Sequence, residues 1–353
     1  MKDQIMELDL GTTDVTAITP KVISSVIEEI RRAKRVFAQP YKSNKDLIES
    51  GGTQIAFPKK KSGITATFDI SAGDGISASN MTYDAVTIAV KKGGIALGFQ
   101  GEAIRQANRD VIADALKEAG EVWADTLDIV ALEAMFPSAE AKPSGTGTVA
   151  VSFPVIGIKS IADTSKFTHI INTTSASSLV VTGANTIAYW YVPATNAGGE
   201  TVGARRVTTS AGSFSAKDIL LARSDIISKN FEPDICIMHP DVLTDILYDP
   251  SVKFLEKSVY RGEGELYNGE LGRIWDLRVI VTTKCPRYGI ILIDSGDLGY
   301  EVTRKPLKMV RDEYTGMSMD VLYFWGFGEI NYGVVNAGAY GAVAMQGTLT
   351  EVN

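Results

Sequence analysis

Apolar residues alternate with polar or small residues in two stretches of the chain, at residues 64–70 and 86–90. A period of two residues is typical of β-strands. The polar, glycine-containing stretch 71–80 separates the two runs, so the pattern predicts a long β-hairpin within residues 53–92. Because a lone two-stranded hairpin is marginally stable in water, we expect it to lie on its own domain or on a neighbouring subunit.

A helical period follows, from about Glu102 to Phe136, and Pro137 ends it. This helix would be roughly 50 Å long. Gly120 costs about 1 kcal/mol there relative to alanine, so a kink or a close backbone contact is expected. One face carries an acidic stripe, made of Asp114, Glu118, Glu121, Asp125 and Asp128. Like charges at this spacing repel one another, so the stripe is either a solvated face or a surface for a basic partner.

Residues 1–20 are polar and predict an irregular arm, after which Thr19-Pro20 opens a second helix over about 22–36. Four cations lie near its C-terminal end: Arg31, Arg32, Lys34 and Arg35. They complement the helix dipole on a solvated face, or they contact nucleic acid or an acidic partner.

The second half of the chain changes character twice. Short β-type runs separated by small polar residues, with small-residue linkers at both ends, predict a β-rich inserted domain at 145–212. A mixed α/β pattern follows from Ser213, with helices predicted at 215–227 and 240–247 and buried strands at 234–238, 278–282 and 290–293. Three further β-like runs with aromatic residues lie at 323–325, 330–332 and 342–345.

Composition narrows the class of protein. The 353 residues are 45% hydrophobic and 22% charged, which excludes a disordered or collagen-like chain. The net charge of −7 argues against a whole-surface DNA binder but is compatible with a local basic patch. The first residues carry acids where a signal peptide has an apolar core, and no apolar run reaches the length of a membrane helix. We therefore expect a soluble protein made in the cytosol.

The residue types of catalytic and metal sites are scarce. The two histidines, His169 and His239, are far apart, and the two cysteines, Cys236 and Cys285, suit a reducing compartment or a buried apolar role. HExxH, CxxC, Walker, GxGxxG and GxSxG motifs are all absent from the sequence. We expect no cofactor, no metal and no enzymatic activity. His239 follows a predicted strand directly, which favours packing or helix capping over catalysis.

The order of these parts resembles that of the tailed-phage major capsid proteins. The segments that carry the resemblance are Phe214–Ile227, Cys236–Pro240 (ending in Met-His-Pro), Gly269–Thr282, Arg311–Tyr314, Tyr323–Ile330 and Val343–Met345. The resemblance covers most of the chain except 145–212. It implies an α+β fold of the Hong Kong 97 type. The implied parts are an arm with its helix (1–52), an extended loop (53–94), a peripheral domain with a spine helix (95–144), the inserted domain (145–212), an axial domain (213–295) and C-terminal strands (296–353).

The resemblance also implies a function. Such subunits form the hexamers and pentamers of an icosahedral virion shell, which is assembled in the host cytoplasm, encloses double-stranded DNA and contains a portal protein. The scaffolding segment that some members carry at the N-terminus is missing here, so a separate scaffold protein is expected. An encapsulin-like nanocompartment shell is the alternative with the same fold. A soluble hydrolase or glycan-binding protein is the alternative of a different class, favoured by the Ser/Thr/Asn-rich stretch 163–210.

Two sets of contacts are expected on this basis. The hairpin base carries Lys59, Lys60 and Lys61, which we expect to face the acidic stripe of the next subunit. The four cations at 31–35 are expected to face the packaged DNA.

Overall fold

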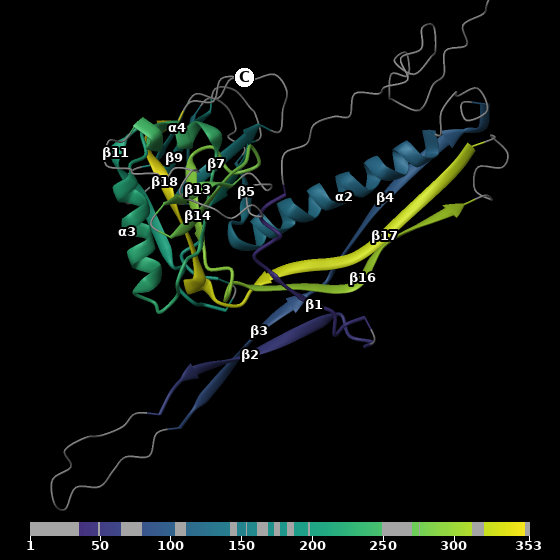
Figure 1. The fold of residues 1–353 in the computed structure, drawn as a ribbon, viewed down its shortest axis with the longest axis horizontal. Coiled ribbons are helices and arrows are strands. Elements are labelled where there is room, and N and C mark those ends of the chain that lie inside the picture. The colour runs from purple at the N-terminus through teal and green to yellow at the C-terminus, as the bar shows by residue number, and fades with distance from the viewer. Residues whose placement is uncertain are drawn as a thin grey trace, which may run out of the picture.

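The structure is a computed structural model. It describes residues 35–48, 50–64, 80–102, 111–141, 147–152, 154–160, 169–172, 177–181, 187–196, 198–248, 270–274, 276–312 and 321–349. Three parts are visible in Figure 1: a mixed helix-and-sheet domain, a long helix lying along long strands, and a narrow hairpin that points away from both.

The long strands form a four-stranded sheet, here called the long sheet. Its order is β1 (Lys42–Asn44), β16 (Gly299–Asp312), β17 (Val321–Val334) and β4 (Lys91–Gln100). Helix α2 (Val111–Met135) lies along this sheet and contacts β17 and β4 (Figure 1). The predicted spine helix is therefore present from residue 111 onward. Residues 103–110, near its predicted start, lie outside the described residues.

Glycines let α2 approach the long sheet closely. A Cβ atom at Gly93 would lie 2.7 Å from the indole ring of Trp123, and one at Gly328 would lie 2.8 Å from it. Gly93 therefore belongs to a strand under the helix, whereas the sequence pattern indicates an exit from the hairpin there. The close backbone contact expected at Gly120 is not found, because a Cβ atom at this position would meet nothing within 4 Å.

The hairpin consists of β2 (Gln54–Ser62) and β3 (Thr82–Ala89), which pair antiparallel. Most of the predicted strand 64–70 lies outside the described residues, and the strand that is observed begins ten residues earlier. Pro58 stands opposite Ala85 in the middle of β2. Proline is tolerated at this position because, among the described strands, β2 pairs with β3 alone.

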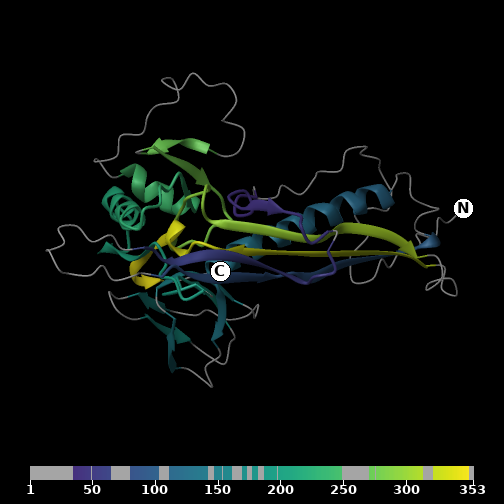
Figure 2. The same cartoon turned by 90° about the horizontal axis from the view of Figure 1, so that it is seen from below.

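The mixed domain is built on a nine-stranded sheet, here called the central sheet. Its order is β13 (Glu270–Ile274), β14 (Leu277–Val281), β12 (Ile235–Met238), β15 (Gly289–Ile293), β18 (Tyr340–Leu349), β8 (His169–Asn172), β9 (Ser177–Val181) and β6 (Gly147–Val151), with β11 (Ala204–Ala211) also pairing with β18. Seen from below in Figure 2, β13 and the teal strands of residues 147–181 lie at opposite ends of it.

Both faces of the central sheet are buried, as the unbroken apolar sequence of β12 predicts. Cys236 and Met238 face α3 (Ala216–Ile227) and α4 (Pro240–Tyr248), whose apolar residues complete one core. Ile235 and Ile237 point to the opposite side, where the last turn of α2 forms a second core. The predicted order of helices and strands from residue 213 to 293 is thus found in the structure.

Residues 145–212 do not form a lobe outside this core, in contrast to the sequence-based expectation. Strand β11 pairs in parallel with β18, and β8 pairs with the far end of β18. Strands β7 (Val155–Ser160) and β10 (Ile187–Tyr191) form a small sheet with β5 (Ser138–Ala141). Ile156 and Val192 are fully buried in the same core as the end of α2. The small-residue linker at 210–212 therefore marks a turn, with Gly212 at a φ of +76°, rather than a domain boundary, and residues 142–146 lie outside the described residues.

Candidate assembly site

The acidic stripe is divided between two environments. Asp128 has 0% of its surface exposed. Its Oδ1 oxygen accepts hydrogen bonds from the backbone N–H groups of Val36, Phe37 and Ala38, over 3.0, 2.8 and 3.1 Å. The Nζ atom of Lys284 lies 3.8 Å from its Oδ2 oxygen. Asp128 therefore holds residues 36–38 on α2, and no other subunit can reach its carboxylate in this arrangement.

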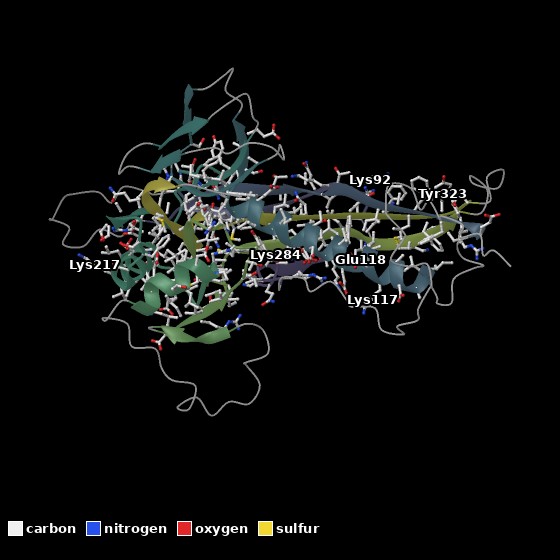
Figure 3. All side chains as sticks on the ribbon, turned by 90° about the horizontal axis from the view of Figure 1, so that it is seen from above. Lys92, Lys117, Glu118, Lys217, Lys284 and Tyr323 are labelled. Atoms are coloured by element: carbon white, nitrogen blue, oxygen red, sulfur yellow. The ribbon has the colours of Figure 1, made fainter. Side chains whose placement is uncertain are left out.

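Asp125, one turn earlier, binds two cations of its own chain. Arg35 Nε lies 3.0 Å and Lys284 Nζ 2.8 Å from its Oδ1 oxygen. Arg35 also donates to the backbone carbonyl of Glu121. Figure 3 shows Lys284 at this junction and Glu118 further out on α2. The inner half of the stripe is therefore used within the chain, and Asp114 and Glu118 are its exposed members.

The predicted DNA-facing cations are only partly described. Arg31, Arg32 and Lys34 lie outside the described residues. Arg35 is paired with Asp125, as given above, and residues 35 and 36 are not helical, although the predicted helix extends to 36. The sequence signal for the Arg35 pair was the acidic stripe itself, which required a cation.

The lysines of the hairpin base also differ from one another. Lys59 binds Glu200 of its own chain, with Nζ 2.5 Å from Oε1. Lys60 is exposed on the hairpin, and the side chain of Lys61 lies outside the description. Lys92, at the start of β4, places its Nζ atom 4.7 Å from the centre of the Phe327 ring, a cation–π contact.

Three aromatic residues form a row on the face of the long sheet opposite α2. Phe324 and Gly328 face the helix, so the alternate residues Tyr323, Trp325 and Phe327 point away from it. Their cross-strand neighbours on β4 are small: Gly98, Ala96 and Gly94. Phe327 is 51% exposed, and Val310 beside Trp325 is 54% exposed. We call this surface the aromatic face; its sequence signal is the alternation of aromatics over 323–327.

The outer half of the hairpin, from the pair of Lys60 and Tyr83 outward, carries exposed apolar side chains among polar ones. Tyr83 is 65% exposed, and Ile64 and Met81 are exposed beyond it. Monomeric proteins rarely leave clustered apolar side chains in water, so an exposed cluster indicates a surface for a partner. The chain thus has two such surfaces on separate parts of its fold.

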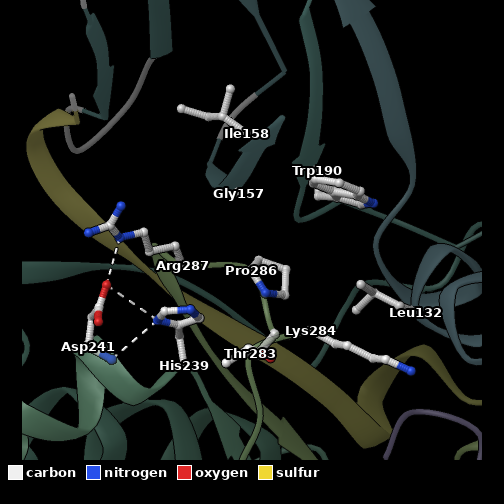
Figure 4. A pocket seen from close by; sticks show the side chains of 11 residues that line it. Leu132, Gly157, Ile158, Trp190, His239, Asp241, Thr283, Lys284, Pro286 and Arg287 are labelled. Carbon is white, nitrogen blue, oxygen red and sulfur yellow. Dashed lines mark hydrogen bonds and ion pairs between the residues drawn. The ribbon is translucent and has the colours of Figure 1, made fainter. Parts of the chain in front are cut away.

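A pocket of about 480 Å³ lies between the small sheet and the central sheet, lined by Trp190, Pro286 and His239 among others (Figure 4). His239 Nδ1 accepts the backbone N–H of Asp241 over 3.2 Å at the start of α4, and Arg287 binds the Asp241 carboxylate over 2.7 Å. Burial lowers the pKa of His239, which favours the neutral ring that this capping bond requires. His239 is therefore a capping residue, one of the two roles expected from the sequence.

Two searches of the described residues bear on other classes of site. None of the described helices combines the length and apolarity needed to span a membrane. In the same part of the chain, no cluster of three or more His, Cys, Asp or Glu side chains is arranged to hold a metal ion.

Comparison with solved structures identifies the fold. The chain aligns with a structure from Mycobacterium phage Ogopogo at a TM-score of 0.57 and 11% identity, covering 95% of this chain and 100% of the other. The capsid of a native GTA particle gives a TM-score of 0.56 at 13% identity, with 95% and 100% covered. The capsid of cyanophage P-SCSP1u gives 0.55 at 12% identity, with 96% of each chain covered.

No protein-family model matches the sequence, and no curated protein matches it. The structural likeness nevertheless extends over nearly the whole chain, at 95–96% of its length. The sequence-based resemblance is thus confirmed for the fold: this chain has the fold of the tailed-phage major capsid proteins.

Proposed function

We propose that this protein is a major capsid protein of the Hong Kong 97 type, which assembles into an icosahedral shell around the double-stranded DNA of a tailed virus. The observation that carries the proposal is the nearly complete two-way coverage between this chain and capsid subunits. The two exposed apolar surfaces support it, because a shell subunit must leave surfaces uncovered until it meets other copies.

The purified protein tests this directly. Negative-stain microscopy and sedimentation velocity should detect closed particles of uniform size, far heavier than the 37.9 kDa subunit. The separate scaffold protein that we expect would be supplied by co-expression with the neighbouring genes. A chain that remains monomeric both alone and in that co-expression would contradict the proposal.

The main contact between subunits joins the outer half of the hairpin, with Tyr83, to the aromatic face of the next copy. The two surfaces lie on separate parts of one chain, so each must find its counterpart on another chain. Contacts between two different surfaces are heterologous, and they form rings when the rotation from copy to copy closes after five or six copies, which is the geometry of pentamers and hexamers. Phe327→Asp should therefore block assembly and leave the subunit folded. Val122→Asp, a similar change at an exposed site on α2, serves as the control.

We propose charged contacts between subunits for fewer residues than the sequence alone predicts. Lys60 and Lys61 face Asp114 and Glu118 of a neighbour, whereas Lys59 and Asp128 serve their own chain. Exposed ion pairs contribute only about 0–1 kcal/mol each, so their effect is on register and on salt dependence. Lys60→Glu with Lys61→Glu should slow assembly, and Asp114→Lys with Glu118→Lys in the same chain should partly restore it. Unchanged assembly of the lysine variant would exclude these contacts.

Contact with packaged DNA is proposed for Arg31, Arg32 and Lys34. Neutralising these three residues should weaken DNA retention in the assembled particle and reduce its salt dependence, since each phosphate contact releases counterions. Arg35→Gln is the matched comparison, because it removes a cation that pairs with Asp125 and should affect folding stability instead. DNA retention that is equal in both variants would contradict the assignment.

A further inference from the structure

Lys59 and Glu200 meet at the point where the hairpin leaves the rest of the molecule. The carboxylate of Glu200 lies 2.5 Å (Oε1) and 2.7 Å (Oε2) from Lys59 Nζ. The same lysine donates to the backbone carbonyl of Val335, 3.4 Å away, and Glu200 Oε2 accepts the backbone N–H of Ala337 over 3.3 Å. Ala337 begins the short helix η4 (Ala337–Ala339) between β17 and β18. One ion pair thus connects the hairpin, the 195–201 turn and the entry to β18.

The turn that carries Glu200 is held by its own hydrogen bonds, which do not involve Lys59. Asn196 Oδ1 accepts the backbone N–H groups of Gly198 and Glu200, each over 2.9 Å. The backbone N–H of Asn196 donates to the carbonyl of Glu200, and Gly199 adopts a φ of +75°, a conformation that suits glycine. Glu200 therefore presents its carboxylate from a closed, hydrogen-bonded turn, which reduces the entropy lost when the ion pair forms.

Other contacts of the hairpin base are with the long sheet and with Leu47, and Val86 of β3 also lies close to Gly198 of the turn that carries Glu200. The Phe57 ring stacks on Tyr300 with centres 4.4 Å apart, and Ile88 packs with Leu47 and Val302. Asn331 Nδ2 donates to the carbonyl of Ala89 over 2.7 Å. The contacts of Phe57, Ile88 and Asn331 hold the base of the hairpin against the long sheet. The pair between Lys59 and Glu200 attaches the hairpin to the mixed domain as well. Attachment at two separate places sets the direction of the hairpin, whereas attachment at one place would let the hairpin pivot.

We propose that Lys59 and Glu200 form a clasp that sets the direction of the hairpin before subunits meet, with Glu200 as the positioning residue. This inference rests on the proposed capsid function. The direction of the hairpin would set the angle between neighbouring subunits and therefore the curvature of the shell. Both side chains are partly shielded, at 25% and 34% exposure, so the pair is screened by salt less than a surface pair would be. Loss of the clasp should alter the geometry of the shell and leave the fold of the subunit intact.

The first measurement uses the unassembled subunit and does not depend on shell formation. Spin labels are placed at Tyr83→Cys on the hairpin and Lys217→Cys on α3, both exposed positions, while the native cysteines are buried and unreactive. Pulsed electron resonance then reports the distribution of distances between the labels. Glu200→Gln, which keeps the shape of the side chain but removes its charge, should broaden this distribution, and Lys59→Met should do the same.

The control is Lys60→Met, which removes the adjacent exposed lysine and should leave the distribution unchanged. Exchange of the two charges, Lys59→Glu with Glu200→Lys, re-forms the ion pair but not the bonds to Val335 and Ala337, so it should restore part of the narrow distribution, which a purely local packing role would not. The second measurement is the size distribution of assembled particles, which should become heterogeneous in Glu200→Gln with an unchanged unfolding midpoint. Distances and particles identical to wild type in both single variants would overturn the clasp. A wild-type chain that never assembles would refute the capsid function but not the distance result.

Discussion

The backbone N–H of Phe37 donates a 2.8 Å hydrogen bond to the Oδ1 oxygen of Asp128, a residue 91 positions later in the sequence. The N–H groups of Val36 and Ala38 converge on the same oxygen. A single carboxylate oxygen thus accepts three backbone N–H groups at the start of the turn formed by residues 37–40. This contact determines where residues 35–41 pass over α2.

Replacement of Asp128 should separate the role of its oxygen from the role of its charge. Asp128→Ala leaves three buried N–H groups without a partner and should lower the free energy of unfolding by about 3–5 kcal/mol. Asp128→Asn keeps the accepting oxygen and should lower it by about 1–2 kcal/mol. Urea denaturation followed by circular dichroism provides the comparison. Equal losses in the two variants would mean that the charge, rather than the hydrogen bonds, anchors the segment.

The pH dependence of stability should carry a signature of Asp128. Burial raises the pKa of this carboxyl above its ordinary value, against the opposing effects of its N–H bonds and Lys284. The folded chain then holds the proton more tightly than the unfolded chain does. The resulting stabilisation is present below the unfolded pKa of about 3.9 and is lost as pH rises through the folded pKa. The unfolding free energy of wild type minus that of Asp128→Asn should fall as pH is raised from about 4; a rise would contradict the shift.

Two glycines near α2 should respond in opposite directions to the same substitution. Gly93→Ala would place a methyl group 2.7 Å from the Trp123 ring and should destabilise the fold by about 1–3 kcal/mol. Gly120→Ala adds a methyl group to an exposed helix position with open space and should stabilise the fold by up to about 1 kcal/mol. Thermal unfolding of the unassembled subunit measures both. Stabilisation by Gly93→Ala would show that Trp123 does not pack as described.

Both cysteines should be inert in the folded protein. Burial raises the pKa of Cys236 to about 12 and also raises the pKa of Cys285. A thiol reagent at about pH 8 reacts with the thiolate form, which is almost absent at such pKa values. Native protein should therefore show no rapid reaction, and protein in denaturant should show two reactive thiols. Rapid labelling of Cys236 without denaturant would indicate that the core between α3 and the central sheet opens readily, and rapid labelling of Cys285 would indicate the same for the core at the end of α2.

Removal of residues 145–212 should prevent folding. The deletion would take away β11, a hydrogen-bonded neighbour of β18, and would open the core around Ile156 and Val192. Ile156→Ala alone should cost about 2–5 kcal/mol, because it leaves a cavity in that core. Soluble expression and circular dichroism of the deletion variant test the expectation. A soluble, cooperatively unfolding deletion variant would restore the interpretation of 145–212 as a separate domain.

Local signals in the sequence were sufficient for some elements. The unbroken apolar run of β12 and the near capping box at Ser215 and Asp218 predict the order of elements around α3 and α4, and Asp218 Oδ2 does accept the Ser215 N–H over 3.1 Å. The helical period likewise predicts α2. These features depend on residues close together in the chain, where periodicity and capping preferences act directly.

Features that depend on distant residues were not predictable in this way. Strand β2 was missed because Pro58 and three consecutive lysines disguise its alternation. The aromatic runs at 323–325 and 330–332 belong to one strand, β17, because Gly326 and Gly328 make room for Met309 and Trp123.

The site was predicted in residue type but not in pairing. The acidic stripe was interpreted either as a solvated face or as a surface for a basic partner. Lys284, which pairs with Asp125, is 159 positions away from it, and no periodicity spans that separation. The aromatic face escaped notice because period-two aromatics also occur in strands that are buried on both sides. Only the register between β17 and β4, with small residues opposite the rings, identifies it as a surface.

The position of β18 has a consequence for the synthesis of the protein. This strand lies between β15 and β11 in the central sheet, although the ribosome makes it after every other described strand. Nascent chains therefore cannot close the sheet while residues 340–349 are still inside the ribosome tunnel, and non-local pairing of this kind is slow. Incomplete chains lack the strand that joins the two halves of the sheet, so we expect proteases to degrade them. Only chains that include residues 340–349 can therefore complete the central sheet.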